Sequence, residues 1–80
     1  MRTITLWTQD GCSLCAQVKE ALAGEPLEER DVAQLLSGAD KDDDAMAQLA
    51  MQDMQLPVVR IDGQFLDVET VLRQARTRAA

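Results

Sequence analysis

Hydrophobic and polar residues alternate over residues 3–7, where isoleucine and leucine are separated by threonine. This period of two, with β-branched side chains, predicts a strand. Over residues 13–23 the spacing of the apolar residues changes to that of a helix, and Gly24 follows. We therefore expect a helix over 13–23 that ends before this glycine.

The middle of the chain has a weaker pattern. A faint alternation among many charges over 27–32 predicts a short strand or an edge strand. Residues 37–44 have the composition of a loop that leads into a helix over about 43–54, because carboxylates in a first turn suit the positive end of the helix dipole. No other element is predicted between 27 and 54.

The last third of the chain carries the clearest turn signal. β-branched residues follow Pro57, and Asp62-Gly63 predicts a two-residue hairpin turn into a second strand at 64–66. Asp67 is then placed to cap a final helix. The predicted order is β-α-β-α-β-β-α, and without a linker or an internal repeat we expect a single domain over 1–80.

Charge and composition argue against several functional classes. The 80 residues include 8 Lys and Arg against 14 Asp and Glu, a net charge of -6, which repels nucleic acid and anionic membranes. The aromatic residues, Trp7 and Phe65, are too few for a platform that stacks single strands. There is no apolar run long enough for a membrane span or a signal-peptide core. We expect a soluble protein of the reducing cytoplasm, since one cysteine pair is no disulfide scaffold.

Cys12 and Cys15, the two cysteines, lie three positions apart after the predicted first strand. A structural disulfide there would close a four-residue loop and add only about 2 kcal/mol of stability. A closed zinc site needs four ligands, and the chain has no histidine and no further cysteine. Two buried packing residues remain a simple alternative.

We favour a redox pair. With Asp10 or Gly11 as the N-cap, Cys12 falls in the first turn of a helix, where unpaired amides and the dipole lower the pKa of a thiol. Cys15, one turn later, is placed to resolve a mixed disulfide. The Asp10 carboxylate opposes this by raising the thiol pKa unless its charge is used as the cap. Lys19 is expected to be solvated.

The whole chain resembles the glutaredoxin family. The stretch ITLWTQDGCSLC resembles the first strand and active-site loop of that family, and LPVVRIDGQFL resembles its proline-containing turn and closing hairpin. The resemblance implies a three-layer α/β thioredoxin-like fold with a four-stranded mixed sheet. It also implies dithiol thiol-disulfide oxidoreductase activity on protein or small-molecule disulfides, with Cys12 attacking and Cys15 resolving.

The resemblance further implies a substrate-binding surface. Leu56-Pro57 is expected to be a cis peptide bond next to the cysteines, with its backbone offering a strand-like edge to the substrate. Gly11, Ser13 and Asp67 are the other expected substrate-binding residues. Trp7 is expected to pack beneath the active-site loop.

Departures from the family pattern leave the electron donor open. Thr8-Gln9 stands where glutathione-using glutaredoxins carry a lysine, and Ser13-Leu14 lacks their aromatic residue. The donor is therefore either glutathione or thioredoxin reductase with NADPH. We expect no tightly bound cofactor and no metal, disulfide-containing proteins or small thiol adducts as partners, and a monomer.

Two alternatives stay open at this point. The first is an iron-sulfur cluster carrier, in which two copies of the chain each contribute Cys12. The second is a non-catalytic thioredoxin-like binding module that keeps its cysteines as packing residues.

Overall fold

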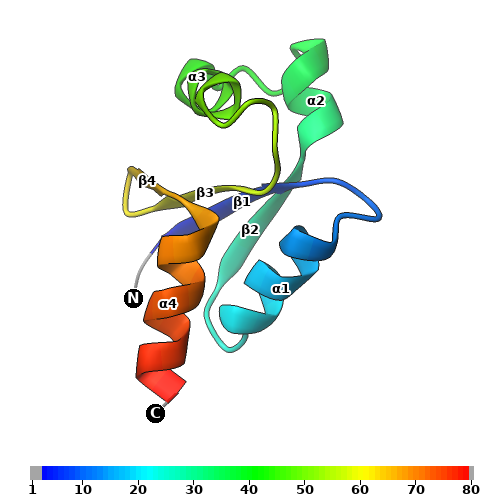
Figure 1. The fold of residues 1–80 in the computed structure, drawn as a ribbon. Helices are drawn as coiled ribbons and strands as arrows, with labels where there is room; N and C mark the ends of the chain where they lie inside the picture. Colours follow the sequence, from blue (N-terminus) through cyan, green and yellow to red (C-terminus); the bar gives the residue numbers. More distant parts are fainter. Residues whose placement is uncertain (1–2, 80) are drawn as a thin grey trace.

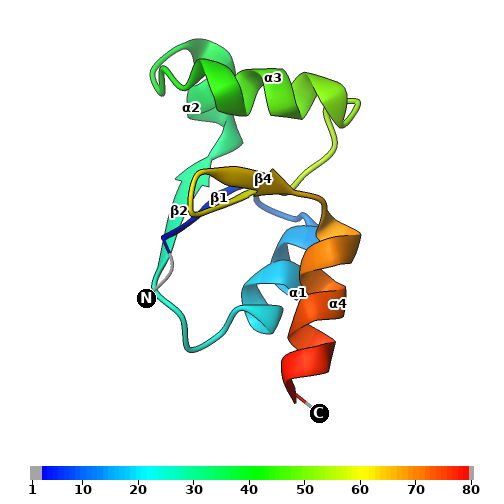
Figure 2. The same ribbon diagram turned by 90° about the vertical axis from the view of Figure 1, so that its left-hand side faces the viewer.

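The computed structural model describes residues 3–79 and forms three layers, with helices on both faces of one sheet (Figures 1 and 2). The helices α1 and α4 cover one face, and α2 and α3 cover the other. The fold is α/β and thioredoxin-like, as predicted. Its elements are, in order, β1 (Ile4–Thr8), α1 (Ser13–Ala21), β2 (Leu27–Asp31), α2 (Val32–Ser37), α3 (Asp43–Met51), β3 (Val58–Ile61), β4 (Gln64–Leu66) and α4 (Val68–Ala79).

The sheet has four strands in the order β2-β1-β3-β4. β1 is parallel to β2 and antiparallel to β3, and β3 and β4 form the predicted antiparallel hairpin. Since β1 is central and covered on both faces, all five of its residues are buried. This confirms the mixed four-stranded sheet.

Alternation along β1 divides the core into two clusters, one on each face. Ile4 and Leu6 point toward α1 and α4, whereas Trp7 points toward α2 and α3. The first cluster contains Ile4, Leu6, Val18, Leu22, Val59, Ile61 and Val71. The second contains Trp7, Val32, Leu35, Ala45, Leu49 and Val58. Trp7 therefore packs in the core under α2 and α3 and not, as expected, beneath the active-site loop.

Helix α2 was missing from the predicted order, which becomes β-α-β-α-α-β-β-α. It begins immediately after β2, because the Asp31 carboxylate accepts a hydrogen bond from the Ala33 amide at 2.9 Å and caps the helix. Val32 and Leu35, three positions apart, are buried against the sheet. Gly38 ends the helix in the left-handed region, at φ 87°.

Two helix ends also differ from the predictions. α1 ends at Ala21, two residues early, and α3 ends at Met51 rather than Met54. After α3, Asp53 and Met54 have φ values of 54° and 61°, so the chain turns sharply before it enters β3.

Among residues 3–79, no helix has the length and apolar character that a membrane crossing requires.

Candidate active site

The β1–α1 connection forms a tight turn that delivers the cysteines to the start of α1. Gly11 adopts φ 80°, a conformation that glycine reaches without the steric penalty of a Cβ. The Cys12 amide donates a hydrogen bond to the Gln9 carbonyl at 3.2 Å and closes the turn. The Cys12 carbonyl in turn accepts from the Ala16 amide at 3.2 Å, which begins the helical ladder.

Cys12 itself is the N-cap of α1. Its backbone is extended, and its Sγ accepts a hydrogen bond from the Cys15 amide at 3.2 Å. The expectation that Asp10 or Gly11 would cap the helix is wrong, because the sulfur occupies the place that an oxygen fills in ordinary caps. Cys12 therefore lies one position before the first turn, with a first-turn amide directed at its sulfur.

Cys12 and Cys15 form a disulfide, with their Cα atoms 5.2 Å apart. The two cysteines differ in exposure: residue Cys12 is half-buried, whereas residue Cys15 is 2% exposed. A reagent or substrate in solution therefore reaches the sulfur of Cys12 first. Cys15 can act only on what is already attached to its neighbour.

A hollow of about 380 Å³ opens beside the disulfide on its β2 side. The turn over 8–13 and the first turns of α1 form most of its wall, and Lys19 and Glu29 complete it. The charged ends of these two side chains are 2.9 Å apart and both side chains are 46% exposed, so Lys19 is solvated, as predicted, but it is also ion-paired. Its charge is compensated by a carboxylate from the edge strand, which the sequence analysis did not single out.

The Leu56-Pro57 bond is cis, as the family resemblance implied. Val58, the first residue of β3, pairs with Trp7 near the end of β1, so residues 56–57 lie at the end of the sheet where β1 leads into the cysteine turn. Figures 1 and 2 agree in placing this segment beside the start of α1. Pro57 is buried and Leu56 is half-buried.

Asp67, Gly11 and Ser13 lie at the same end of the sheet. β4 runs back along β3, and Leu66 pairs with Val59, so Asp67 follows β4 close to the proline segment. The carboxylate of Asp67 caps α4 by accepting from the Thr70 amide at 2.8 Å, as predicted. Hydrogen bonds from the Thr70 side chain and amide lower the pKa of this carboxyl. Gly11 and Ser13 are exposed.

One further residue at this end carried no sequence signal. The side-chain amide nitrogen of Gln52 donates hydrogen bonds to the carbonyls of Gln55 and Pro57, at 3.0 Å and 3.2 Å. Its side chain thus spans the segment that contains the cis bond. A glutamine just after a helix has no pattern that predicts such a contact.

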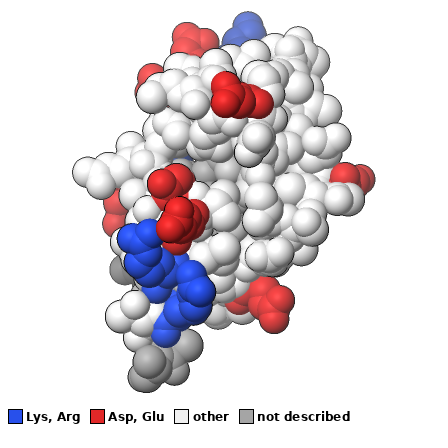
Figure 3. All heavy atoms as spheres, viewed as in Figure 1, with Lys and Arg blue, Asp and Glu red and all other residues white. Residues whose placement is uncertain are grey.

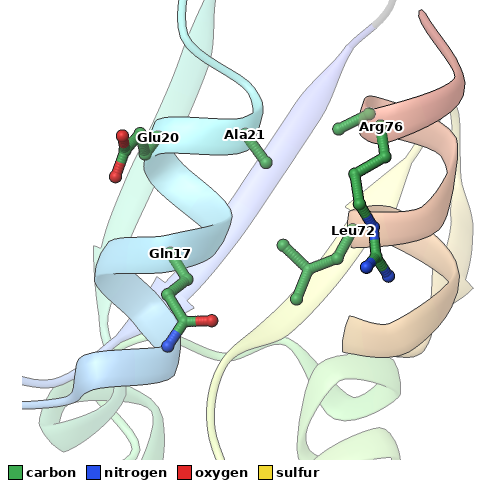
Figure 4. Close-up of a pocket in the computed structure, with 6 residues that line it drawn as sticks. Gln17, Glu20, Ala21, Leu72 and Arg76 are labelled. Carbon is green, nitrogen blue, oxygen red and sulfur yellow. The ribbon is translucent and has the colours of Figure 1, made fainter. Parts of the chain in front are cut away.

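A second hollow, of about 520 Å³, lies away from the cysteines, between α1 and α4. Ala21 and Leu72 point into this gap, while Glu20 points away from it (Figure 4). No cysteine lines it. Within residues 3–79 there is also no cluster of three or more acidic or cysteine side chains arranged to hold a metal ion.

Charged side chains leave much of one face uncovered. In the view of Figure 3 the basic residues gather over α4, and the centre of the face carries neither sign of charge. Among the exposed large apolar residues, Leu14 (40%) is the second residue of α1, Met51 (79%) ends α3, and Met54 (54%) lies in the turn after it.

Comparisons of the chain with protein-family models, with curated proteins and with solved structures gave no match. The thioredoxin-like fold and the C-x-x-C disulfide at the start of α1 are thus the observations from which a function has to be argued.

Proposed function

We propose that this chain is a dithiol thiol-disulfide oxidoreductase that works as glutaredoxins do. The observation that carries the proposal is the asymmetry of the disulfide. Cys12 is half-buried and its sulfur accepts an N–H from the first turn of α1, while Cys15 is buried within bonding distance of it. An amide and a helix dipole directed at Cys12 stabilise its thiolate, which is the nucleophilic form.

The reaction proceeds in two exchanges. The Cys12 thiolate attacks one sulfur of the substrate disulfide, and the other substrate sulfur leaves and takes a proton from solvent. Cys15 then loses its proton to solvent and attacks the Cys12 sulfur. The second substrate thiol is released, and the Cys12–Cys15 disulfide forms. Two electrons pass from the dithiol to the substrate.

An external thiol donor has to return these two electrons before another cycle. Two glutathione molecules can do so, as can a thioredoxin reductase supplied with NADPH. The acidic chain, the absence of a lysine at Thr8-Gln9 and the pairing of Lys19 with Glu29 remove attraction for the anionic glutathione molecule. Residues 56–57, Gly11, Ser13 and Asp67 form the surface on which the substrate is held.

The test uses trapping variants of the intact chain. With Cys15→Ser, the first exchange occurs and the second cannot, so the protein accumulates as a mixed disulfide detectable by its mass. With Cys12→Ser, the exposed nucleophile is gone and no adduct forms. Equal labelling of both variants, or of neither, by a model peptide disulfide contradicts the proposal.

The donor is identified with the wild-type chain and NADPH. One assay supplies thioredoxin reductase and the other glutathione with its reductase, and each follows consumption of NADPH in the presence of a model disulfide. Turnover with one system alone names the donor. Absence of turnover with both, in a protein whose thiols titrate as free groups of ordinary reactivity, favours a non-catalytic binding module.

A further inference from the structure

The side chain of Gln52 braces the segment that contains Leu56. Both N–H bonds of its amide are used, one on the Gln55 carbonyl and one on the Pro57 carbonyl. Its carbonyl oxygen accepts from the Gln48 side chain at 2.9 Å, which fixes the orientation of the amide. Gln52 therefore acts as a clamp between the end of α3 and the start of β3.

The brace spans a turn that needs support. Asp53 and Met54 are consecutive residues with positive φ, a backbone conformation that is tolerated by aspartate but uncommon for a residue such as methionine. The first half of this turn is held by a backbone hydrogen bond to the end of α3, which the Met54 amide donates to the Leu49 carbonyl at 2.9 Å. Gln52 holds the second half.

The brace also determines which backbone groups stay open. The carbonyls on both sides of Leu56 are occupied by Gln52, and within residues 3–79 the amide and carbonyl of Leu56 have no hydrogen-bond partner. Leu56 is half-buried, so its free amide and carbonyl can pair with a bound peptide without first breaking a hydrogen bond inside the chain. A donor and an acceptor on one residue are the pair of groups that an extended peptide uses when it adds to a strand edge.

We infer that Gln52 is a positioning residue that presets residues 55–57 to pair with an extended peptide, and that it makes the chain selective for disulfides within polypeptides. This inference rests on the proposed function. A peptide that flanks the substrate disulfide uses the open groups of Leu56, and the exposed Met51 and Met54 offer apolar contact next to it. A small disulfide without a peptide backbone gains nothing from the brace.

The test compares two substrates on the same reduced protein. One is a peptide of about eight residues joined to a second copy through a central cysteine, which is long enough to form strand pairing. The other is bis(2-hydroxyethyl) disulfide, which has no amide. The protein is reduced, freed of reductant and mixed with increasing amounts of each substrate, and oxidation of its thiols is followed over a single turnover.

The variant Gln52→Glu keeps the shape of the side chain and removes both donated hydrogen bonds. Gln34→Glu makes the same change at an exposed position of α2 and serves as the control for charge. We expect Gln52→Glu to raise the half-saturating peptide concentration about tenfold and to change the limiting rate by less than about twofold. The rate with bis(2-hydroxyethyl) disulfide and the alkylation rate of Cys12 stay within about twofold.

The results test the positioning role of Gln52 separately from the oxidoreductase function. If the wild type oxidises with both substrates and Gln52→Glu loses both equally, or neither, the positioning role is overturned and the proposed function stands. If the wild type oxidises with neither substrate, the proposed function fails and this inference with it. The ratio of the two rates is measured on one folded population, and Gln52→Met repeats the test without the added charge.

Discussion

The α2/α3 core around Trp7 and the turn that carries the cysteines use polar groups in opposite ways. Around Trp7 buried polar side chains pair with one another: its indole N–H donates to Asp40 at 3.0 Å, and Arg60 donates to Asp42 at 2.8 Å. The guanidinium groups of Arg30 and Arg60 lie 5.5 Å and 4.9 Å from the centre of the Trp7 ring. At the cysteine turn, the half-buried Cys12 borders an open hollow.

This difference distinguishes polar groups that stabilise the fold from polar groups that are available for a reaction. A cluster whose donors and acceptors are all satisfied holds elements together, and this one ties α2 and α3 to the central strands. A reactive group has to remain open to its substrate, so it is found where the pairing is incomplete. The charged cluster around Trp7 is therefore expected to control stability, and the disulfide turn to control reactivity.

Replacing Trp7 is expected to have the largest effect on stability. Trp7→Ala removes the largest fully buried side chain and the partner of Asp40, which destabilises the fold by about 3–5 kcal/mol. Urea unfolding followed by circular dichroism measures this loss. In conditions where the variant is folded, Cys12 should be alkylated at the wild-type rate to within about twofold. A tenfold change in the alkylation rate of Cys12 would show that the core around Trp7 also controls the reactivity of the cysteine turn.

Trp7→Phe keeps most of the apolar volume and removes the indole donor. It should lose less than Trp7→Ala, about 1–3 kcal/mol, because Asp40 retains Arg30 as a partner. This variant also serves if Trp7→Ala does not fold.

Breaking the ion pair of the α2/α3 core comes next. Arg60→Met leaves the Asp42 carboxylate, which is 17% exposed, without its closest cation, and we expect a loss of about 1–3 kcal/mol. The matched control is Arg73→Met, which breaks a pair with Glu69 whose side chains are 64% and 77% exposed. That change should alter the free energy of unfolding by less than about 0.5 kcal/mol. Equal losses for the two variants would show that burial does not distinguish these pairs.

Acid should weaken the same region. Burial raises the pKa of Asp42, but the Ala45 amide and the charges of Arg60 and Arg30 lower it by more, so the net shift is below the ordinary value of 3.8. A carboxyl whose pKa is lower in the folded state stabilises the fold above its unfolded pKa, and this contribution is lost as pH falls through the folded value. The urea midpoint should therefore fall between about pH 5 and pH 3, and less steeply in Asp42→Asn.

Local patterns predicted much of this molecule. The alternation of β1, the Asp62-Gly63 turn and the Asp67 cap all depend on neighbours in sequence, and the structure confirms them. Helix α2 is not predicted from the sequence because it is six residues long and begins directly after a strand. Only two of its residues are buried, which is too few to show a helical spacing of apolar residues. Its local signals are Asp31 as the cap at its start and Gly38 at its end.

Only part of the candidate site could be predicted from the sequence. The C-x-x-C pair and its place at the start of α1 follow from spacing, but sulfur is not among the usual caps, so the role of Cys12 at the helix start was assigned to its neighbours. The position of Trp7 could have been inferred, since alternation puts it opposite Leu6. The contacts of Gln52 and Glu29 could not, because they depend on how the chain folds back on itself.

The smallest expected effect concerns Asp10, whose exposed carboxylate lines the hollow beside the disulfide and does not cap α1. In the reduced protein this negative charge opposes the Cys12 thiolate, so Asp10→Asn should lower the thiol pKa and speed alkylation of Cys12 at neutral pH about two- to threefold. Added salt should reduce the difference, because the charges interact through solvent.

Asp44→Asn supplies the control, since it removes the same charge from the first turn of α3 on the other face of the sheet. If both variants speed alkylation equally, the total charge of the chain governs the thiol and the carboxylate in the hollow has no special place. If only Asp10→Asn does, the sulfur of Cys12 responds to a charge within its own turn and not to a carboxylate on the other face of the sheet. The second result is the one that the geometry of the two regions requires.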